Sequence, residues 1–156
     1  MNDRLDIADV LYRYARAVDR LDLDGIRACY WPDAIDDHGG YHGPIDGLLE
    51  DIRGRHRTID SSQHFITNVL VDLTGPDSAD VESYCLCYLR QARKGGESDQ
   101  ELAVIRCRYL DRFERREGRW GIAGRTVVFD EYLRQRVTDE LSPGWVRSQR
   151  GPTVNS

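Results

Sequence analysis

A few side chains of this sequence could transfer protons, because histidine titrates nearest to neutral pH. His64 is one of four histidines and stands in the segment SSQHFITN, at the start of a predicted strand. Strand alternation places Ile66 and Asn68 on the same face as His64. His64 is therefore either a general base in an enclosed site or a structural histidine at a strand end, and the sequence leaves both open.

Two further candidates lie on the first predicted helix. Asp19 closes this helix, where an acid is mildly unfavourable because the carbonyl end of the helix dipole is negative. An acid at that position indicates a second role. Tyr14 lies on the apolar stripe of the helix, so we expect a buried ring and a hydroxyl that needs a partner. A plain core tyrosine is the alternative.

Arg125 lies in the segment WGIAGRTVVFD of the last predicted strand, where Val127 and Phe129 share its face. An arginine that points inward must pair with an acid, or it binds an acidic or electron-rich ligand. If Arg125 faces inward, Phe129 lines a cavity, and Cys87 and Tyr109 join it from the two preceding strands.

Tyr30, at the end of the second predicted helix, is expected near the mouth of that cavity. The alternative is that all these aromatic and thiol side chains form a solid core, since packed interiors are the default.

The remaining histidines predict little chemistry. His38 lies beside Asp36 and Asp37 before two glycines, which favours a turn cap over a metal site. His42 and His56 are expected at the surface. The four cysteines occupy apolar runs without metal-ligand spacing, so we expect buried free thiols and neither disulfides nor a metal: Cys29, Cys85, Cys87 and Cys107.

Composition and missing motifs exclude several classes of function. A net charge of -5, from 27 acids and 22 bases, disfavours nucleic-acid binding. Phosphate-loop, dinucleotide-binding, hydrolase-elbow and zinc-protease patterns are absent, so no cofactor is expected. The acidic start MNDRLDIADV does not resemble a signal peptide, and no apolar run is long enough to cross a membrane. We therefore expect a cytoplasmic protein without membrane contact.

Three helices are predicted in the first third of the chain. Apolar residues recur at steps of three and four over residues 3–18 and again from the Gly-Pro pair at 43–44 to Ile52. A short helix over residues 24–30 is expected to end at Trp31-Pro32, because the residue before a proline avoids the helical region. Residues 34–37 are expected to be extended.

Beyond residue 62 the period changes to that of strands. Four β-branched or aromatic runs, separated by turn-forming segments, predict an antiparallel meander over residues 64–73, 81–91, 101–115 and 120–129. Helices followed by a sheet indicate an α+β fold of one domain, residues 1–141, with the helices on one face of a curved sheet. An irregular tail is expected over residues 142–156.

The order of several short motifs resembles the nuclear transport factor 2-like superfamily in its SnoaL-like branch, which includes scytalone dehydratase, bile-acid 7α-dehydratase and hexachlorocyclohexane dehydrochlorinase. The similarity covers about residues 4 to 132 and rests on YxxxxDxxD, WPDA, QHFITN and YLDRFERREGRWGIAGR. The resemblance implies a cone-shaped, strongly curved and mostly antiparallel sheet that, with N-terminal helices, encloses a pocket.

The same resemblance implies roles for individual residues. Asp19 and His64 match the family's aspartate-histidine dyad, Tyr14 matches a tyrosine of several dehydratases, and Arg125 matches an arginine that holds substrate or leaving group. It implies a lyase or isomerase, a dehydratase or related enzyme, that acts without a cofactor on a small, fairly apolar cyclic substrate. Tyr30, Asn68, Cys87, Tyr109 and Phe129 are the expected pocket residues.

The sequence also departs from the dehydratase pattern. The strand where some dehydratases carry a second ionisable group reads VESYCLCYLRQ, without histidine or aspartate. The non-enzymatic alternative is a ligand-binding or assembly subunit similar to the small subunit of ring-hydroxylating dioxygenases, for which we expect a collapsed pocket or one open to a partner.

The resemblance implies a homotrimer, with a dimer as the alternative. The physical reason for expecting self-association is that Trp120, Ile122 and Val128 fall on the outer side of the sheet by alternation, and that Trp145 and Val146 stand in a polar tail.

Overall fold

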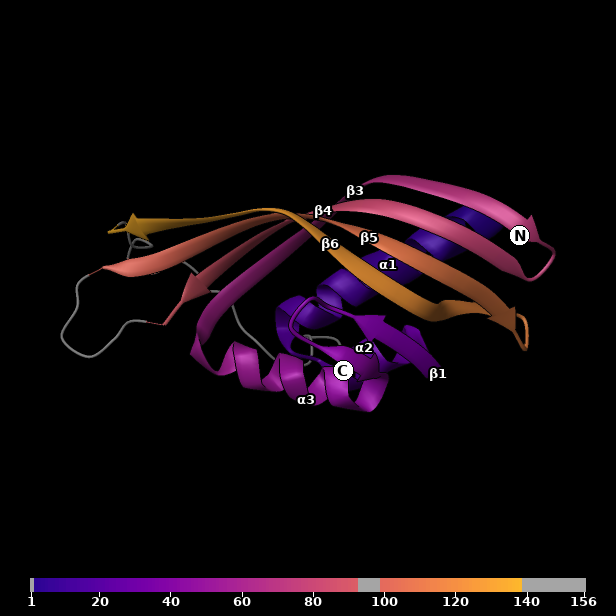
Figure 1. Cartoon of the computed structure of the whole chain (residues 1–156), viewed down its shortest axis with the longest axis horizontal. Helices are drawn as coiled ribbons and strands as arrows, with labels where there is room; N and C mark the ends of the chain where they lie inside the picture. The colour runs from indigo at the N-terminus through magenta and orange to yellow at the C-terminus, as the bar shows by residue number, and fades with distance from the viewer. Residues whose placement is uncertain (1, 93–98, 139–156) are drawn as a thin grey trace, which may run out of the picture.

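Six strands form one mixed sheet in the computed structural model, which describes residues 2–92 and 99–138 (Figure 1). The sheet order is β2-β1-β6-β5-β4-β3. The strands are β1 (Tyr30–Asp37), β2 (His42–Pro44), β3 (Ile59–Gly75), β4 (Ser78–Gln91), β5 (Gln100–Arg116) and β6 (Arg119–Val137). All neighbouring pairs are antiparallel except β1 and β6, which run parallel.

The helices are α1 (Asp3–Arg20), α2 (Leu23–Ala28) and α3 (Ile45–Arg55), followed by a single 3-10 turn, His56–Thr58. In Figure 1 α1 lies along one face of the long strands, and α3 lies beyond it on the same side. The buried stripe of α1 repeats at three- and four-residue steps, through Ile7, Leu11, Tyr14 and Val18. α1 and α3 therefore occupy the positions that the periodicity predicts. The short helix α2 ends at Ala28, before the predicted end at residue 30, because Tyr30 already begins β1.

The α+β prediction is confirmed, since the helices precede a meander of four long strands on a curved sheet. The sheet does not close into a barrel: within the described residues, β2 and β3 are its two edges. The strands are longer than the apolar runs from which they were predicted, because the charged residues at their ends continue the backbone pairing of the hairpins.

A register shift in β6 overturns one prediction about its outer face. Arg112 pairs with Gly124 while Phe113 pairs with Ile122, so Ala123 is an extra residue between the two pairs. Such a bulge reverses the alternation of side chains along the strand. Trp120 and Ile122 are therefore buried in the core (4% and 0% exposed) instead of lying outside, and the prediction was wrong for both.

Val128 lies beyond the bulge and is half-buried. The predicted tail over residues 142–156, with Trp145 and Val146, lies outside the described residues. Among the helices of the described part, none has both the length and the hydropathy that crossing a bilayer requires.

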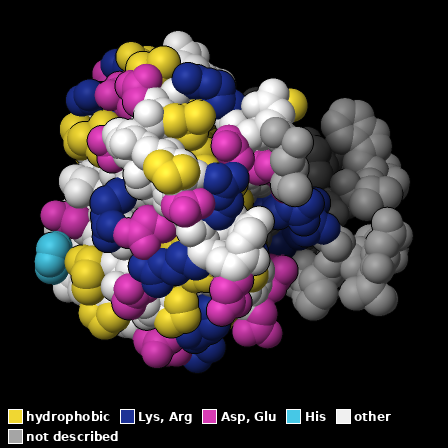
Figure 2. Space-filling view, turned by 90° about the vertical axis from the view of Figure 1, so that its right-hand side faces the viewer, with side chains coloured by type: hydrophobic (Ala, Val, Ile, Leu, Met, Phe, Trp, Pro, Cys, Tyr) yellow, Lys and Arg dark blue, Asp and Glu magenta, His cyan; other side chains and the backbone are white. Residues whose placement is uncertain are grey.

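The surface carries acids and bases close together. Figure 2 shows one face of the molecule on which arginine and acidic side chains alternate, with separate hydrophobic side chains between them. Cross-strand ion pairs join charges of this kind on the sheet, such as Arg106 with Glu131 and Arg108 with Asp130. This face has no single-sign field of the kind that attracts a polyphosphate.

Candidate active site

The carboxylate of Asp19 contacts His64 inside the fold. One carboxylate oxygen lies 2.6 Å from Nδ1 of His64, and the other accepts the backbone N–H of His64 at 3.1 Å. The hydroxyl of Ser62 donates to the first oxygen, also at 3.1 Å. Three hydrogen bonds thus hold the carboxylate, and the Nδ1 contact orients the imidazole.

The end of α1 explains how Asp19 reaches this position. The helix stops at Arg20, and Leu21 takes a left-handed conformation (φ 55°) while its N–H bonds to Ala17 and Val18 carbonyls. Asp19 lies in the last turn, beside the first residues of β3. The acid that is unfavourable for the helix dipole is stabilised by donors from the sheet.

His64 is a stronger base than an ordinary histidine. Burial lowers the pKa of His64, but the hydrogen bonds with Asp19 and Cys87 and the charges of the neighbouring thiolates outweigh it and raise that pKa to about 10. Near neutral pH the ligand-free protein therefore holds an imidazolium next to the Asp19 carboxylate.

The second ring nitrogen of His64 faces a thiol. Nε2 lies 3.2 Å from Sγ of Cys87, which stands directly opposite His64 in the β3–β4 register. Asp19, His64 and Cys87 thus form one connected row, and the alternation that groups Cys87 with the inner face is confirmed.

A cavity of about 60 Å³ lies next to this row. It is lined by residues of the helical layer and of the sheet: Tyr14, Val18, His38, Ile52, Arg55, His56, His64, Cys87, Leu89, Ile105, Cys107, Tyr109, Val127 and Phe129. Phe129 is half-exposed at the cavity. The space is well below the roughly 150 Å³ of an engineered cavity that takes up benzene.

Two of the expected pocket residues do not line this cavity. Asn68 is exposed and adopts a left-handed conformation (φ 50°) where the β3–β4 register shifts between Thr67 and Leu70, so the alternation that grouped it with His64 is broken. Tyr30 is buried behind Tyr14, with ring centroids 5.9 Å apart, instead of lying at the mouth.

Arg125 points inward, the orientation that the sequence left open, and pairs with an acid. Nε and Nη2 each donate to a different carboxylate oxygen of Asp111 at 2.7 Å, and both side chains are fully buried. Its guanidinium carbon lies 4.3 Å and 4.0 Å from the ring centroids of Tyr14 and Tyr109. Within the described residues its Nη1 has no hydrogen-bond partner.

Arg125 does not line the cavity; Tyr14 and Tyr109, the two rings it contacts, do. Burial raises the pKa of Tyr14 above its ordinary value, although the positive charge of Arg125 opposes this effect. The Tyr14 hydroxyl therefore stays protonated and can act as a hydrogen-bond donor.

A second histidine-carboxylate pair also borders the cavity. Nδ1 of His38 lies 3.2 Å from Asp36, and the hydroxyl of Tyr30 donates to the other oxygen of Asp36 at 2.7 Å. Burial would raise the pKa of Asp36, but the contacts with His38, Arg125 and Tyr30 hold it below its ordinary value. Asp36 is thus a carboxylate that orients His38.

Sequence reasoning missed parts of this arrangement. The turn-cap role fits Asp37, whose carboxylate accepts the N–H of Gly39, while the His38 ring contacts Asp36 at the cavity. His56 is buried at the cavity, so its predicted surface position was wrong; the 3-10 turn after α3 brings it inward. His42 is exposed as expected.

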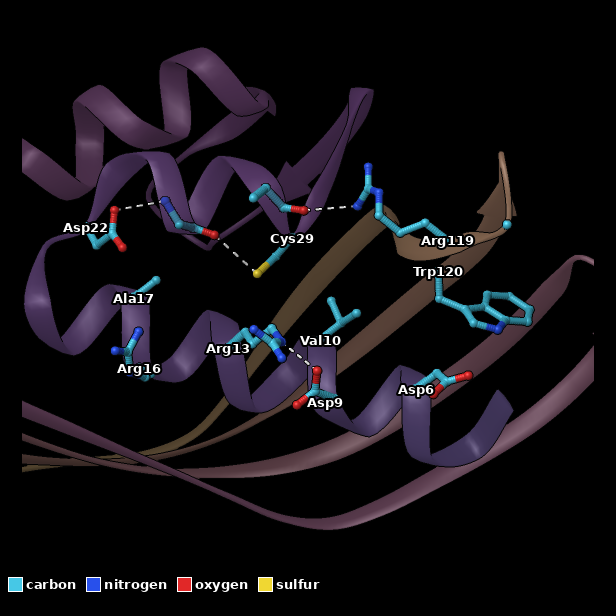
Figure 3. Close-up of a pocket in the computed structure, with 13 residues that line it drawn as sticks. Asp6, Asp9, Val10, Arg13, Arg16, Ala17, Asp22, Cys29, Arg119 and Trp120 are labelled. Carbon is cyan, nitrogen blue, oxygen red and sulfur yellow. Dashed lines mark hydrogen bonds and ion pairs between the residues drawn. The ribbon is translucent and has the colours of Figure 1, made fainter. Parts of the chain in front are cut away.

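A larger hollow of about 430 Å³ lies elsewhere, between α1 and α2 (Figure 3). Arg119 and Trp120 of β6 border one end, and the Cys29 thiol donates to the carbonyl of Gly25. Burial raises the pKa of Cys29 to about 11. No histidine lines this hollow, so the cavity beside His64 is the better candidate for proton transfer.

All four cysteines are free and buried, at the apolar positions where the sequence placed them. Among the described residues, no group of three or more histidine, cysteine or acidic side chains is placed to hold a metal ion. The titratable groups in contact at the cavity are the two histidine-carboxylate pairs and the Cys87 thiol.

A protein-family model described as a SnoaL-like domain matches residues 1–126 of this chain. None of the curated proteins matches this sequence.

Solved structures share the fold at low identity. A type 2 hexachlorocyclohexane dehydrochlorinase is 18% identical, with a TM-score of 0.78 over 92% of this chain and 95% of its own. A protein from Novosphingobium aromaticivorans, provisionally described as scytalone dehydratase, is 15% identical, with a TM-score of 0.75 over 93% and 95%. Another from that organism, provisionally described as an aromatic ring hydroxylase, is 24% identical, with a TM-score of 0.73 over 86% and 93%.

Proposed function

This chain belongs to the SnoaL-like domain family, and from that premise we propose that it is a lyase or isomerase that removes a carbon-bound proton from a small, fairly apolar cyclic molecule. The observation that carries the proposal is the 2.6 Å contact between Asp19 and His64 beside an internal cavity. The names of the dehydratase and dehydrochlorinase neighbours agree with an elimination or related reaction.

In the proposed reaction the neutral form of His64 is the base. Its Nδ1–H donates to Asp19, which leaves the Nε2 lone pair to accept a proton from carbon. The Asp19 carboxylate then stabilises the imidazolium that forms. Cys87 must move away from Nε2 when substrate enters, because its sulfur occupies the position from which Nε2 would reach a carbon.

Tyr14 is proposed as the group that stabilises the developing negative charge. Its protonated hydroxyl could donate a hydrogen bond to an enolate oxygen or assist a departing hydroxide or halide. Arg125, which pairs with Asp111 and lies over the Tyr14 ring, is a positioning residue for Tyr14.

His38 is proposed as the partner acid. It borders the cavity together with His64, and Asp36 orients its ring. Two oriented histidines would let one remove a proton while the other supplies a proton to the leaving group.

A cyclic substrate requires the cavity to enlarge. Phe129 is half-exposed and contacts the His38 ring edge-on, with centroids 6.3 Å apart. Rotation of Phe129 is the proposed opening, since Phe129 and Arg55 are the exposed side chains of the cavity lining.

The test uses exchange of carbon-bound hydrogen, which needs no leaving group. A set of cyclic ketones, hydroxy-ketones and halides is incubated with the protein in D₂O, and exchange or elimination is followed by NMR. We expect one class to react, with kcat/KM about 10²- to 10⁴-fold lower in His64→Ala.

His42→Ala is the matched control, because His42 is exposed on β2 and should leave turnover unchanged. Equal rates for the wild type and His64→Ala would contradict the proposed base.

The small cavity favours a second candidate function. A non-catalytic assembly or ligand-binding subunit, similar to the small subunit of ring-hydroxylating dioxygenases, needs no room for substrate, and the cavity holds only about 60 Å³. This alternative predicts no exchange by the wild type with any ketone in the set.

We also propose self-association, as a trimer or else a dimer. The outer face of the sheet exposes large apolar side chains on β3 and β4, among them Phe65, Tyr84 and Tyr88. Burying such a patch against other copies would remove apolar surface from water.

A further inference from the structure

We propose that Cys87 is a nucleophile activated by His64 and Asp19, and that this site adds its thiol to small conjugated ketones. The proposal rests on the same pocket as the proposed function and names a class of ligand for it. A dehydration of a β-hydroxy ketone yields a conjugated ketone, so this thiol would meet the product of such a reaction.

Three contacts in series support the assignment. Asp19 lies 2.6 Å from Nδ1 of His64, and Nε2 lies 3.2 Å from Sγ of Cys87. A thiol, an imidazole and an orienting carboxylate at hydrogen-bond distance are the arrangement that activates a cysteine. The direct pairing of His64 and Cys87 in the β3–β4 register fixes the sulfur beside the ring.

The step is an addition that needs no oxidant. Burial raises the pKa of the Cys87 thiol, although the contact with His64 opposes this effect, so the step starts from the neutral form of His64. Nε2 takes the thiol proton, and the sulfur forms a bond to the β-carbon of the ketone. The electrons of the carbon-carbon double bond move to the carbonyl oxygen as an enolate. The imidazolium then returns the proton to the α-carbon, which completes a thioether.

The other thiols lack this arrangement. Cys29 lies in the separate hollow of Figure 3 and donates to a carbonyl. Cys107 lines the cavity, but no histidine contact is found for it among the described residues. Cys85 is the competing thiol: a hydrogen bond with Cys107 lowers its pKa to about 6, and it accepts from Tyr109 at 3.4 Å, but it does not line the cavity.

The experiment measures alkylation of the full chain by methyl vinyl ketone, with the modified cysteine located by tandem mass spectrometry. We expect Cys87 to react first. Its rate should fall about 10²-fold in His64→Gln and in Asp19→Asn, and stay unchanged in His42→Gln. Thermal melting of each variant verifies that it is folded.

The proposal is overturned if Cys87 reacts no faster than Cys29, if the adduct forms on Cys85 instead, or if the His64 and Asp19 variants react at the wild-type rate. If His64→Gln does not fold, two other measurements test the proposal: the alkylation rate of Asp19→Asn, and the ratio of the Cys87 and Cys29 rates in the wild type. Alkylation requires no turnover, so Cys87 addition and the proposed proton abstraction can fail independently of each other.

Discussion

Arg125 and Asp111 face each other across β6 and β5 and are joined by two hydrogen bonds of 2.7 Å each, with both side chains closed off from solvent. The pair lies behind the tyrosines that line the cavity. Removing one partner of a buried ion pair leaves an uncompensated charge, whereas the loss of an exposed pair costs little.

Asp111→Asn should therefore destabilise the fold by about 3–5 kcal/mol, because the guanidinium of Arg125 stays buried without its counter-ion. The measurement is urea unfolding followed by circular dichroism. Asp130→Asn is the control, since Asp130 pairs with Arg108 at the surface and little change is expected there. An unfolding free energy that is the same for Asp111→Asn as for the wild type would refute the structural importance of the pair.

The raised pKa of His64 makes stability depend on pH. In the folded state this pKa is about 10 against an ordinary value of 6.5, so the stabilisation is complete below pH 6.5 and is lost as the pH rises through about 10. The free energy of unfolding should fall over this window by at most about 1.4 kcal/mol per pH unit from this group. NMR titration of the His64 ring and unfolding curves at several pH values measure both quantities.

Asp19→Asn should flatten that dependence, because an amide does not hold the imidazolium as a carboxylate does. The base form of His64 also becomes more abundant with rising pH, so exchange activity should increase up to about pH 10. A His64 ring signal that titrates near 6.5 in the wild type would contradict the tight Asp19 contact.

Gly121, at the start of β6, is predicted to tolerate no side chain. A Cβ there would lie 2.9 Å from Nε1 of the buried Trp31, whose N–H donates to the Glu114 carbonyl at 3.0 Å. Gly121→Ala should cost about 1–3 kcal/mol through overpacking. Gly54→Ala in α3 meets no atom within 4 Å and should stabilise by about 0.5–1 kcal/mol, since alanine favours a helix.

Paired thermal melts of the two glycine variants separate these effects. Both replacements add one methyl group, and only Gly121→Ala should lower the midpoint. If both variants raised the melting midpoint, Trp31 would be able to move aside for the added methyl group without loss of stability.

The outer face of the sheet predicts the oligomeric state. Phe65 and Tyr88 contact each other edge-on on this face, with ring centroids 6.1 Å apart. Light scattering at micromolar concentration should give the mass of three chains, or of two in the alternative. Tyr88→Glu should reduce that mass, while Tyr12→Glu, on the exposed side of α1, should not. A single-chain mass for the wild type would remove the proposal.

Local patterns accounted for most of the fold. The apolar stripe of α1 and the turn segments between the strands predict these elements because each pattern depends only on residues close together in the sequence. Asp19 was noticeable because it stands at the unfavourable end of a helix dipole, which indicated a second role. Its pairing with His64 was implied by the family resemblance, and the structure places the two side chains in contact.

The errors come from features that local patterns do not contain. The bulge at Ala123 turns Trp120 inward, and the irregular register near Asn68 turns that residue out; neither is apparent from alternation alone. Cross-strand partners depend on register, so alternation within each strand does not predict that Arg125 pairs with Asp111.

The parallel pairing of β1 with β6 has a consequence for how the protein is made. Residues 30–37 pair with residues 122–126 in the sheet. The first strand to be synthesised therefore cannot form this pairing until the last strand has been made. The meander of β3 to β6 consists of hairpins between segments that are neighbours in the sequence, and such local contacts can form early. The pairing of β1 with β6, in contrast, requires most of the chain to close into one loop. A chain that ends before residue 122 lacks the strand that pairs with β1, and with it Val127 and Phe129 of the cavity lining.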